Sequence, residues 1–212
     1  MTPSQYINSL RDTLAAVSMP DLRSVEGALF DAWLHGQTIF IAGNGGSAST
    51  ASHMANDLNK GTIIPGHHRF RAIALTDNVP LMTAWGNDTA YDRIFVEQMA
   101  NFLRPHDVFV ALSGSGNSPN IIAAVQWARA AGAVTIGLTG GGGGRLRALV
   151  DYGVVVPATG MEQIEDVHLT LVHALCVTLR TRIAVMTPLG DEGSKSRRAL
   201  RKSVLTRQGV AR

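Results

Sequence analysis

The chain has 212 residues, of which 45% are hydrophobic and only one is a cysteine. This length and apolar content predict one globular domain with a substantial core. The polar N-terminus and the lack of an apolar run of about 18 residues argue against a signal peptide and a membrane span. The single cysteine, Cys176, excludes an internal disulfide and favours a reducing, cytoplasmic location.

The basic character of the sequence, with a pI of about 9.4, is concentrated at its C-terminal end. Residues 189–212 contain seven Lys or Arg and two acidic residues, whereas residues 1–188 contain twelve Lys or Arg and fourteen Asp or Glu. The nearly neutral body disfavours nucleic-acid binding. We interpret residues 1–188 as the domain and residues 189–212 as a flexible, solubilising tail. The alternative is a tail that contacts nucleic acid or an acidic partner.

Apolar residues at helical spacing predict two helices, over residues 3–17 and 20–35, before the first strand. Strands then alternate with helices, and several strands are continuous apolar runs, which is typical of a parallel sheet covered on both faces. The predicted strands are 38–42, 70–75, 107–112, 134–138 and 153–156. The predicted helical segments start near Ser47 and at 79–86, 91–103, 119–131, 145–150 and 161–184.

Two glycine-rich loops follow predicted strands and lead into helices. The first is Gly43-Asn-Gly-Gly46, and the second is Ser113-Gly-Ser-Gly-Asn-Ser118. Glycines let a ligand approach the backbone, and the hydroxyls and free N–H groups at a helix start favour an anion such as phosphate. Ligands of open α/β sheets bind at the carboxyl ends of strands, where both loops fall. The first loop is neither a P-loop nor a Gly-x-Gly-x-x-Gly fingerprint, which disfavours nucleotide binding.

A third glycine run, at residues 140–144, has two interpretations. Five consecutive glycines have no rigid shape of their own. The run is either a mobile or ligand-adapted loop, or a plain surface connection between a strand and a helical turn.

Two predicted helices each offer a carboxylate and an imidazole. His53 and Asp57 are four residues apart and share a helix face, and Glu165 and His173 lie about 80° apart around the last helix. This set suits a divalent metal such as zinc, or an acid and a base. The alternative is a set of solvated charges. His168 is about 140° from His173 and is predicted to point elsewhere.

The sequence resembles the sugar isomerase (SIS) domain family, and within it the phosphoheptose isomerase branch. The resemblance runs in order over about residues 5–182 and is carried by five stretches: residues 43–48, 75–78, 86–88, 113–118, and 164–168 with His173. It implies a flavodoxin-like fold and a homotetramer with sites at subunit interfaces. It also implies an aldose–ketose isomerisation, from sedoheptulose 7-phosphate to glycero-manno-heptose 7-phosphate.

The resemblance also implies residue roles. The phosphate would bind the loop residues Ser113, Gly114, Ser115 and Ser118, with Gly114 where the family often has Thr. The sugar would contact Asn44, Gly45, Ser47, Asp88 and Glu165. The zinc and catalytic positions correspond to His53, Asp57, Glu165 and His173, with Asp57 as the base and His173 as the partnering acid.

The chain departs from the family pattern near the proposed chemistry. The usual Glu is Asp57, the usual Gln is Glu165, and an Arg after the first site helix is missing, which leaves Lys60 nearby. Such changes bear on which sugar phosphate is used more than on the fold. The competing function is a non-catalytic SIS module that binds a sugar phosphate or acts as a regulator, like the DnaA initiator-associating protein.

Overall fold

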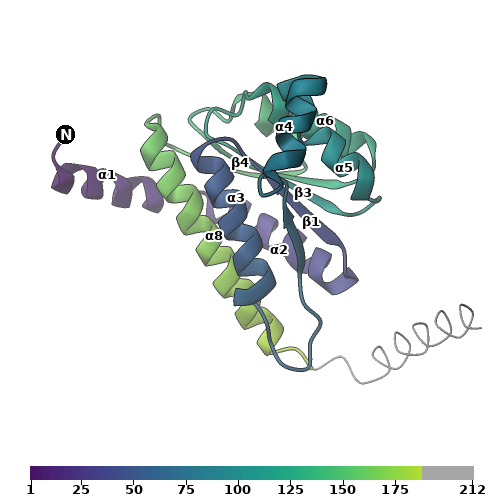
Figure 1. Ribbon diagram of the computed structural model, residues 1–212. Coiled ribbons are helices and arrows are strands. Elements are labelled where there is room, and N and C mark those ends of the chain that lie inside the picture. Colours follow the sequence, from purple (N-terminus) through teal and green to yellow (C-terminus); the bar gives the residue numbers. More distant parts are fainter. Residues whose placement is uncertain (188–212) are drawn as a thin grey trace, which may run out of the picture.

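The computed structural model describes residues 1–187 as a parallel sheet between two layers of helices (Figure 1); the predicted tail, 189–212, lies outside the described residues. The strands are β1 Thr38–Ala42, β2 Arg71–Ala74, β3 Val108–Ser113, β4 Val134–Gly140 and β5 Tyr152–Val156. The helices are α1 Pro3–Ala15, α2 Met19–His35, α3 Gly46–Asn56, α4 Val79–Asp88, α5 Val96–Phe102, α6 Pro119–Ala130, α7 Gly144–Leu149 and α8 Met161–Ala184.

All strand pairs are parallel, and their order is β2-β1-β3-β4-β5. This order is that of flavodoxin-like folds, so the α/β prediction is confirmed. Local differences are small: α4 continues to Asp88, and the helix predicted at 91–103 is split into a 3₁₀ turn, Tyr91–Arg93, and α5. The structure also contains a π-helical turn, Asp57–Gly61, that was not predicted.

The central strands are buried on both faces because alternate side chains enter two separate cores. Ile39 and Ile41 of β1 pack into the core beneath α2, α3 and α8. Phe40, between them, packs into the core beneath α5 and α6. This explains why β1 and β3 are continuous apolar runs rather than alternating ones.

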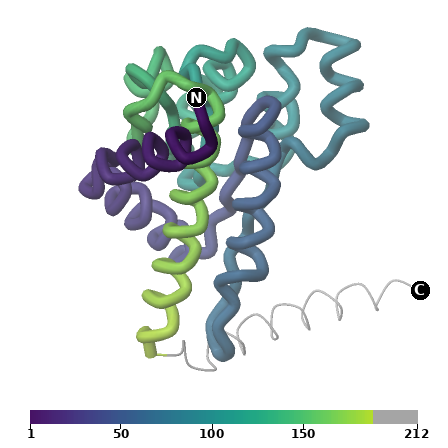
Figure 2. Tube along the Cα trace, turned by 90° about the vertical axis from the view of Figure 1, so that its left-hand side faces the viewer, coloured from purple at the N-terminus to yellow at the C-terminus, as the bar shows by residue number. Residues whose placement is uncertain are grey.

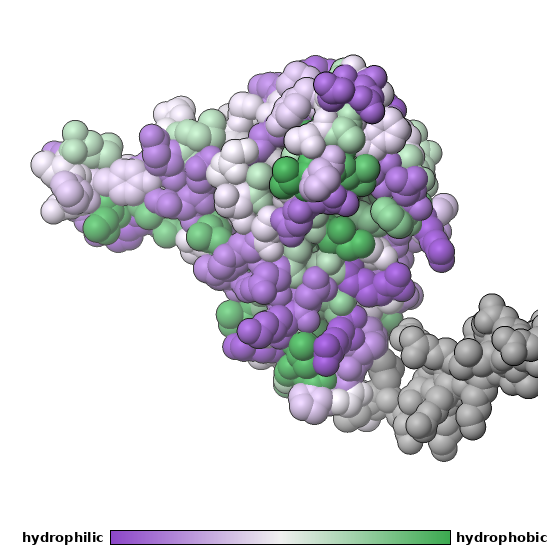
Figure 3. All heavy atoms as spheres, in the orientation of Figure 1, coloured by the Kyte–Doolittle hydropathy of each residue, from purple (hydrophilic) through white to green (hydrophobic). Residues whose placement is uncertain are grey.

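Helices α3 and α8 lie side by side on one face of the sheet, in both views (Figures 1 and 2). Helix α1 lies against the start of α8, where the Tyr6 hydroxyl donates to Asp166 Oδ2 at 2.6 Å. Leu10 and Leu14 of α1 pack against the core, whereas its outer side carries apolar surface, including Ile7, which is 65% exposed (Figure 3). Within residues 1–187, no helix is both long and apolar enough to cross a membrane.

His168 links helix α8 to strand β4 of the sheet. Its side chain is buried, and its Nε2 lies 3.2 Å from the backbone oxygen of Thr139 in β4. Burial lowers the pKa of His168 to about 4, and the contact with the Thr139 carbonyl only partly opposes this shift. The imidazole is therefore neutral in the folded protein, with the Nε2–H donating. Its position inside the core confirms that it points away from His173.

The buried histidine predicts a loss of stability in mild acid. Its pKa is about 4 in the folded chain and 6.5 in the unfolded chain, so protons bind the unfolded state preferentially. The part of the unfolding free energy that depends on a neutral His168 is fully present above pH 6.5 and is lost as the pH falls towards 4. The loss between pH 7 and pH 5 is about 2 kcal/mol.

Chemical denaturation of the wild type and His168→Gln at both pH values tests this. The glutamine keeps an N–H for the Thr139 carbonyl but does not titrate. The variant is expected to lose about 2 kcal/mol less of its unfolding free energy than the wild type over this interval. Equal losses in both proteins would contradict a neutral, buried His168.

Candidate active site at the carboxyl edge of the sheet

The strand order places the two Gly/Ser loops beside each other. Strands β1 and β3 are hydrogen-bonded neighbours, but β1 continues into α3 on one face of the sheet and β3 into α6 on the other. The two chains therefore diverge where the strands end. This is the topological switch point at which open α/β sheets bind ligands.

The first loop is held by a pair of asparagines. Asn44 Nδ2 donates to Asn120 Oδ1 and Asn120 Nδ2 donates to Asn44 Oδ1, both at 2.8 Å. The Tyr91 hydroxyl also donates to Asn44 Oδ1 at 3.2 Å. Asn120 is buried at the start of α6, so it fixes the first loop against the helix that follows the second. Sequence reasoning missed Asn120, although it stands two residues after Ser118.

The second loop is shaped by its own hydroxyl groups. Ser113 Oγ accepts from the Gly116 N–H at 3.2 Å and lies 3.3 Å from Ser118 Oγ. Ser115 Oγ accepts from the Asn117 N–H at 3.2 Å. Ser113 is buried, whereas Ser115 is exposed and Ser118 is half-buried. The three predicted phosphate-binding serines therefore belong to one ordered turn at the end of β3.

The glycine run at 140–144 braces this turn. The Gly140 N–H donates to the Gly114 carbonyl at 3.0 Å, and the Leu146 N–H donates to the Gly116 carbonyl at 2.9 Å. Side chains at Gly116 or Gly144 would collide with the main chain of the other loop. Gly140, Gly143 and Gly144 therefore pack backbone to backbone against the second loop, so the run is more than a plain surface connection.

The first residues of helix α8 pack against three glycines near the carboxyl ends of the strands. A Cβ at Gly46 would collide with the Glu165 carboxylate, one at Gly114 with the Met161 thioether, and one at Gly140 with the Ile164 side chain. The start of α8 can approach the sheet edge this closely because none of the three positions carries a side chain. The first turns of α8 therefore form the roof of the candidate site.

The predicted ionisable pairs meet between α3 and α8. His53 Nε2 lies 2.8 Å from His173 Nε2 and 3.3 Å from Asp57 Oδ2, and His173 Nε2 lies 3.8 Å from the same carboxylate oxygen. One donor atom from each residue lies within 4.8 Å of the other two. Asp57 also starts the π-helical turn that follows the last residue of α3, and such turns are frequently found at functional sites.

The structure does not bring every predicted residue into this cluster. Glu165 is half-buried and turns its carboxylate towards Gly46, and it is not part of the three-residue group. Ser47 is buried in the first turn of α3, and Gly45 is exposed just before it. Asp88 is exposed at the end of α4, where it accepts from Asn87 Nδ2 at 2.8 Å. Among the described residues, no hydrogen bond or ion pair links Asp88 to either loop.

The single cysteine of the chain, Cys176, is not reactive. Cys176 is buried on α8, and burial raises the pKa of its thiol to about 12, with a smaller contribution from the negative charge of Asp57. A thiol with this pKa stays protonated and is neither a nucleophile nor a good metal ligand at neutral pH.

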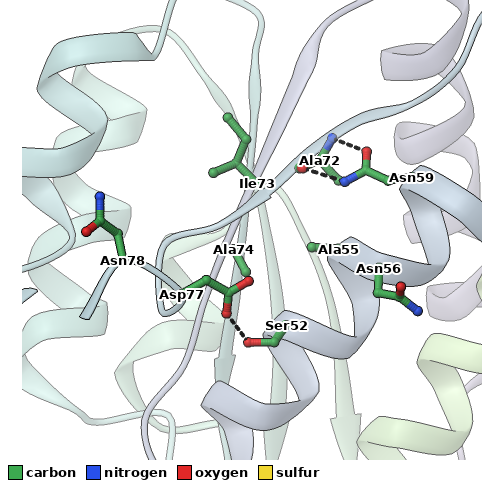
Figure 4. Close-up of a pocket in the computed structure, with 9 residues that line it drawn as sticks. All are labelled: Ser52, Ala55, Asn56, Asn59, Ala72, Ile73, Ala74, Asp77 and Asn78. Atoms are coloured by element: carbon green, nitrogen blue, oxygen red, sulfur yellow. Dashed lines mark hydrogen bonds between the residues drawn. The ribbon is translucent and has the colours of Figure 1, made fainter. Parts of the chain in front are cut away.

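A separate open groove of about 580 Å³ lies between α3 and the edge strand β2 (Figure 4). The polar residues that line the groove bond to one another. Ser52 donates to Asp77, and Asn59 both donates to and accepts from the backbone of Ala72, at 2.8 and 3.0 Å. Asn59 therefore occupies the free backbone edge of β2. None of the predicted site residues lines this groove.

Residues 5–140 of the chain match the family model described as the SIS domain. The chain is 40% identical to the phosphoheptose isomerase of Rhodospirillum rubrum over 157 residues, which cover 74% of this chain and 83% of the relative. It is also 40% identical over 190 residues to the lincomycin biosynthesis protein LmbN of Streptomyces lincolnensis, covering 83% of this chain and 69% of that protein.

Solved structures agree with this likeness. The phosphoheptose isomerase GmhA of Neisseria gonorrhoeae matches with a TM-score of 0.77 and 29% identity, over 84% of this chain and 96% of that chain. A phosphoheptose isomerase from Francisella tularensis matches with a TM-score of 0.75 and 29% identity, over 85% of this chain and all of the other. With its strand order, paired loops and terminal helix, the chain belongs to the SIS domain family, in the branch of the phosphoheptose isomerases.

Proposed function

We propose that this chain converts sedoheptulose 7-phosphate into D-glycero-manno-heptose 7-phosphate through an enediol. The coarser function, an isomerase of sugar phosphates, follows from the family. The seven-carbon substrate is suggested by the relatives named phosphoheptose isomerase, and the chemistry is supported above all by the meeting of Asp57 with His53 and His173. An aldose–ketose isomerisation needs a base that moves a proton between adjacent carbons and an acid that serves their oxygens.

In the proposed complex, the phosphate binds the loop at the end of β3. Its ligands are the hydroxyls of Ser113, Ser115 and Ser118 and backbone N–H groups, including that of Gly114. The sugar contacts the first loop through Asn44, Gly45 and Ser47, and the remaining contacts come from Asp88 and Glu165. Because the asparagine pair already fixes Asn44, little ordering cost remains for substrate binding.

Asp57 and His173 carry the proton transfers in this proposal. Asp57 removes the proton from C1 of the ketose, which gives the 1,2-enediol, and returns it to C2. His173 exchanges protons with the C1 and C2 oxygens, so that the C2 carbonyl becomes a hydroxyl and the C1 hydroxyl becomes the aldehyde. The imidazole stands close enough to Asp57 for both groups to serve adjacent carbons.

The same residues fit a divalent metal. Two imidazole nitrogens and a carboxylate oxygen that converge within 4.8 Å are the donor types that zinc prefers, and three protein ligands leave a position open. We propose that His53, Asp57 and His173 hold zinc, whereas Glu165, which lies outside this group, contacts the sugar. Zinc would polarise the substrate carbonyl and stabilise the enediolate. With zinc bound, the Asp57 carboxylate would serve both as a ligand and as the base.

We also propose a homotetramer with sites at subunit interfaces, in a reducing cytoplasm. The exposed apolar residues on α1 and at the start of α4, Ile7 and Val79, support burial against another copy. Within residues 1–187 Asp88 has no hydrogen bond or ion pair to either loop, which also fits a site that is completed by a second subunit.

Elemental analysis of the purified full chain tests the metal. We expect about one zinc ion per chain in the wild type and nearly none in His53→Gln or His173→Gln, because each change removes one of three donors. His35→Gln is the matched control: His35 is an exposed histidine on α2 that contacts only the Asp31 carbonyl. Equal metal content in all four proteins would contradict the proposed site.

Turnover of sedoheptulose 7-phosphate tests the base. Asp57→Asn keeps the size of the side chain but removes its basicity, so we expect kcat to fall by about 10²–10⁴-fold. Asp12→Asn, an exposed change on α1, is expected to leave turnover unaltered. If Asp57→Asn retains full turnover and the wild type carries no metal, the catalytic assignment fails and the non-catalytic SIS module is favoured.

Light scattering tests the assembly. We expect the full chain, of 22.6 kDa, and a chain truncated after residue 188 to form tetramers, because the exposed apolar surface lies in the body. Ile7→Asp is expected to shift the population towards smaller species, since it places a charge in the proposed interface. A monomeric wild type would contradict the tetramer.

A further inference from the structure

The first residue of α8, Met161, packs against Gly114 of the second loop. A Cβ at Gly114 would collide with Met161 Sδ, would lie 3.2 Å from its Cε, and would reach Ile164 Cγ2 at 3.5 Å. The thioether therefore fills the volume that a side chain at position 114 would take. Met161 is nevertheless 46% exposed, so this packing leaves part of the side chain accessible.

Met161 lies on the same side of α8 as Glu165. Glu165 follows one helical turn later, and residues four apart lie on the same side of a helix. Glu165 reaches Gly46 at the end of the first loop, and Met161 reaches Gly114 in the second. One stripe of α8 thus spans both loops, with a carboxylate over the first and an apolar, flexible side chain over the second.

We propose that Met161 and Gly114 act together as a specificity-determining pair that limits the length of the sugar phosphate. This inference rests on the proposed function. Gly114 offers the phosphate a backbone N–H but no hydroxyl, and the methionine places an apolar wall beside it. Such a wall selects substrates by shape, and a change of one methylene in an apolar wall typically alters selection 10–200-fold.

The kinetic test compares the wild type, Met161→Ala and Met19→Ala with six-, seven- and eight-carbon ketose phosphates. Met161→Ala removes the wall, so the ratio of kcat/KM for the eight-carbon to the seven-carbon substrate is expected to rise about tenfold. Met19 is the matched control, because it is also the first residue of a helix and is 45% exposed. An unchanged ratio in Met161→Ala would overturn the proposal.

A second variant pair tests the packing independently of catalysis. Gly114→Thr alone overpacks the loop against Met161 and is expected to lower the thermal midpoint, whereas Gly114→Thr with Met161→Ala is expected to regain it. Equal midpoints for Gly114→Thr with and without Met161 would show that the two residues are not coupled, and the pair would be rejected.

Failure of the proposed function gives a different result. If the wild type turns over none of the three substrates, the isomerase proposal is contradicted. The length preference is then measured by calorimetric binding of the same ketose phosphates to the wild type and Met161→Ala. A shift in relative affinity towards the eight-carbon compound supports the pair, and identical affinities reject it.

Discussion

The close approach of α8 to the ends of β1, β3 and β4 is the constraint on which the site depends. It exists because Gly46, Gly114 and Gly140 have no side chains at the three points where Glu165, Met161 and Ile164 dock. A Cβ at Gly140 would collide with the branched Ile164 side chain, and one at Gly46 or Gly114 would displace the side chain of Glu165 or Met161 from its present position. His173 lies on the same helix, so the meeting of its imidazole with His53 also depends on how α8 is seated. The glycines thus position groups that they do not touch.

The candidate site joins parts of the chain that are remote in sequence. His53 and His173 are 120 residues apart, and Asn44 and Asn120 are 76 residues apart. Each contact requires the finished sheet, because only the pairing of β1 with β3 brings the two loops together. The buried His168 adds a link from α8 to β4 beneath this arrangement. The geometry of the site and the stability of the fold are therefore coupled.

The elements were largely predictable from the sequence because their signals are local. Strand 38–42 and helix 161–184 agree with the structure to the residue, since buried strands and amphipathic helices have distinct apolar patterns. The π turn after Asn56 and the bracing of Gly116 by the 140–144 run were not predictable. The first depends on tertiary packing of α3. The second is made by backbone groups, and five glycines carry no side-chain information about their partner.

The contacts that hold the second loop bear on the proposed binding of a phosphate there. Its turn is already closed by the contact between Ser113 and the Gly116 N–H, and its outer side is closed by the backbone of the 140–144 run. The loop therefore loses its conformational freedom when the protein folds rather than when a ligand binds, which favours affinity. The same bracing leaves the loop little room to adapt to different ligands. Differences in the ligand must then be accommodated opposite the loop, where the half-exposed, unbranched Met161 is the adaptable element.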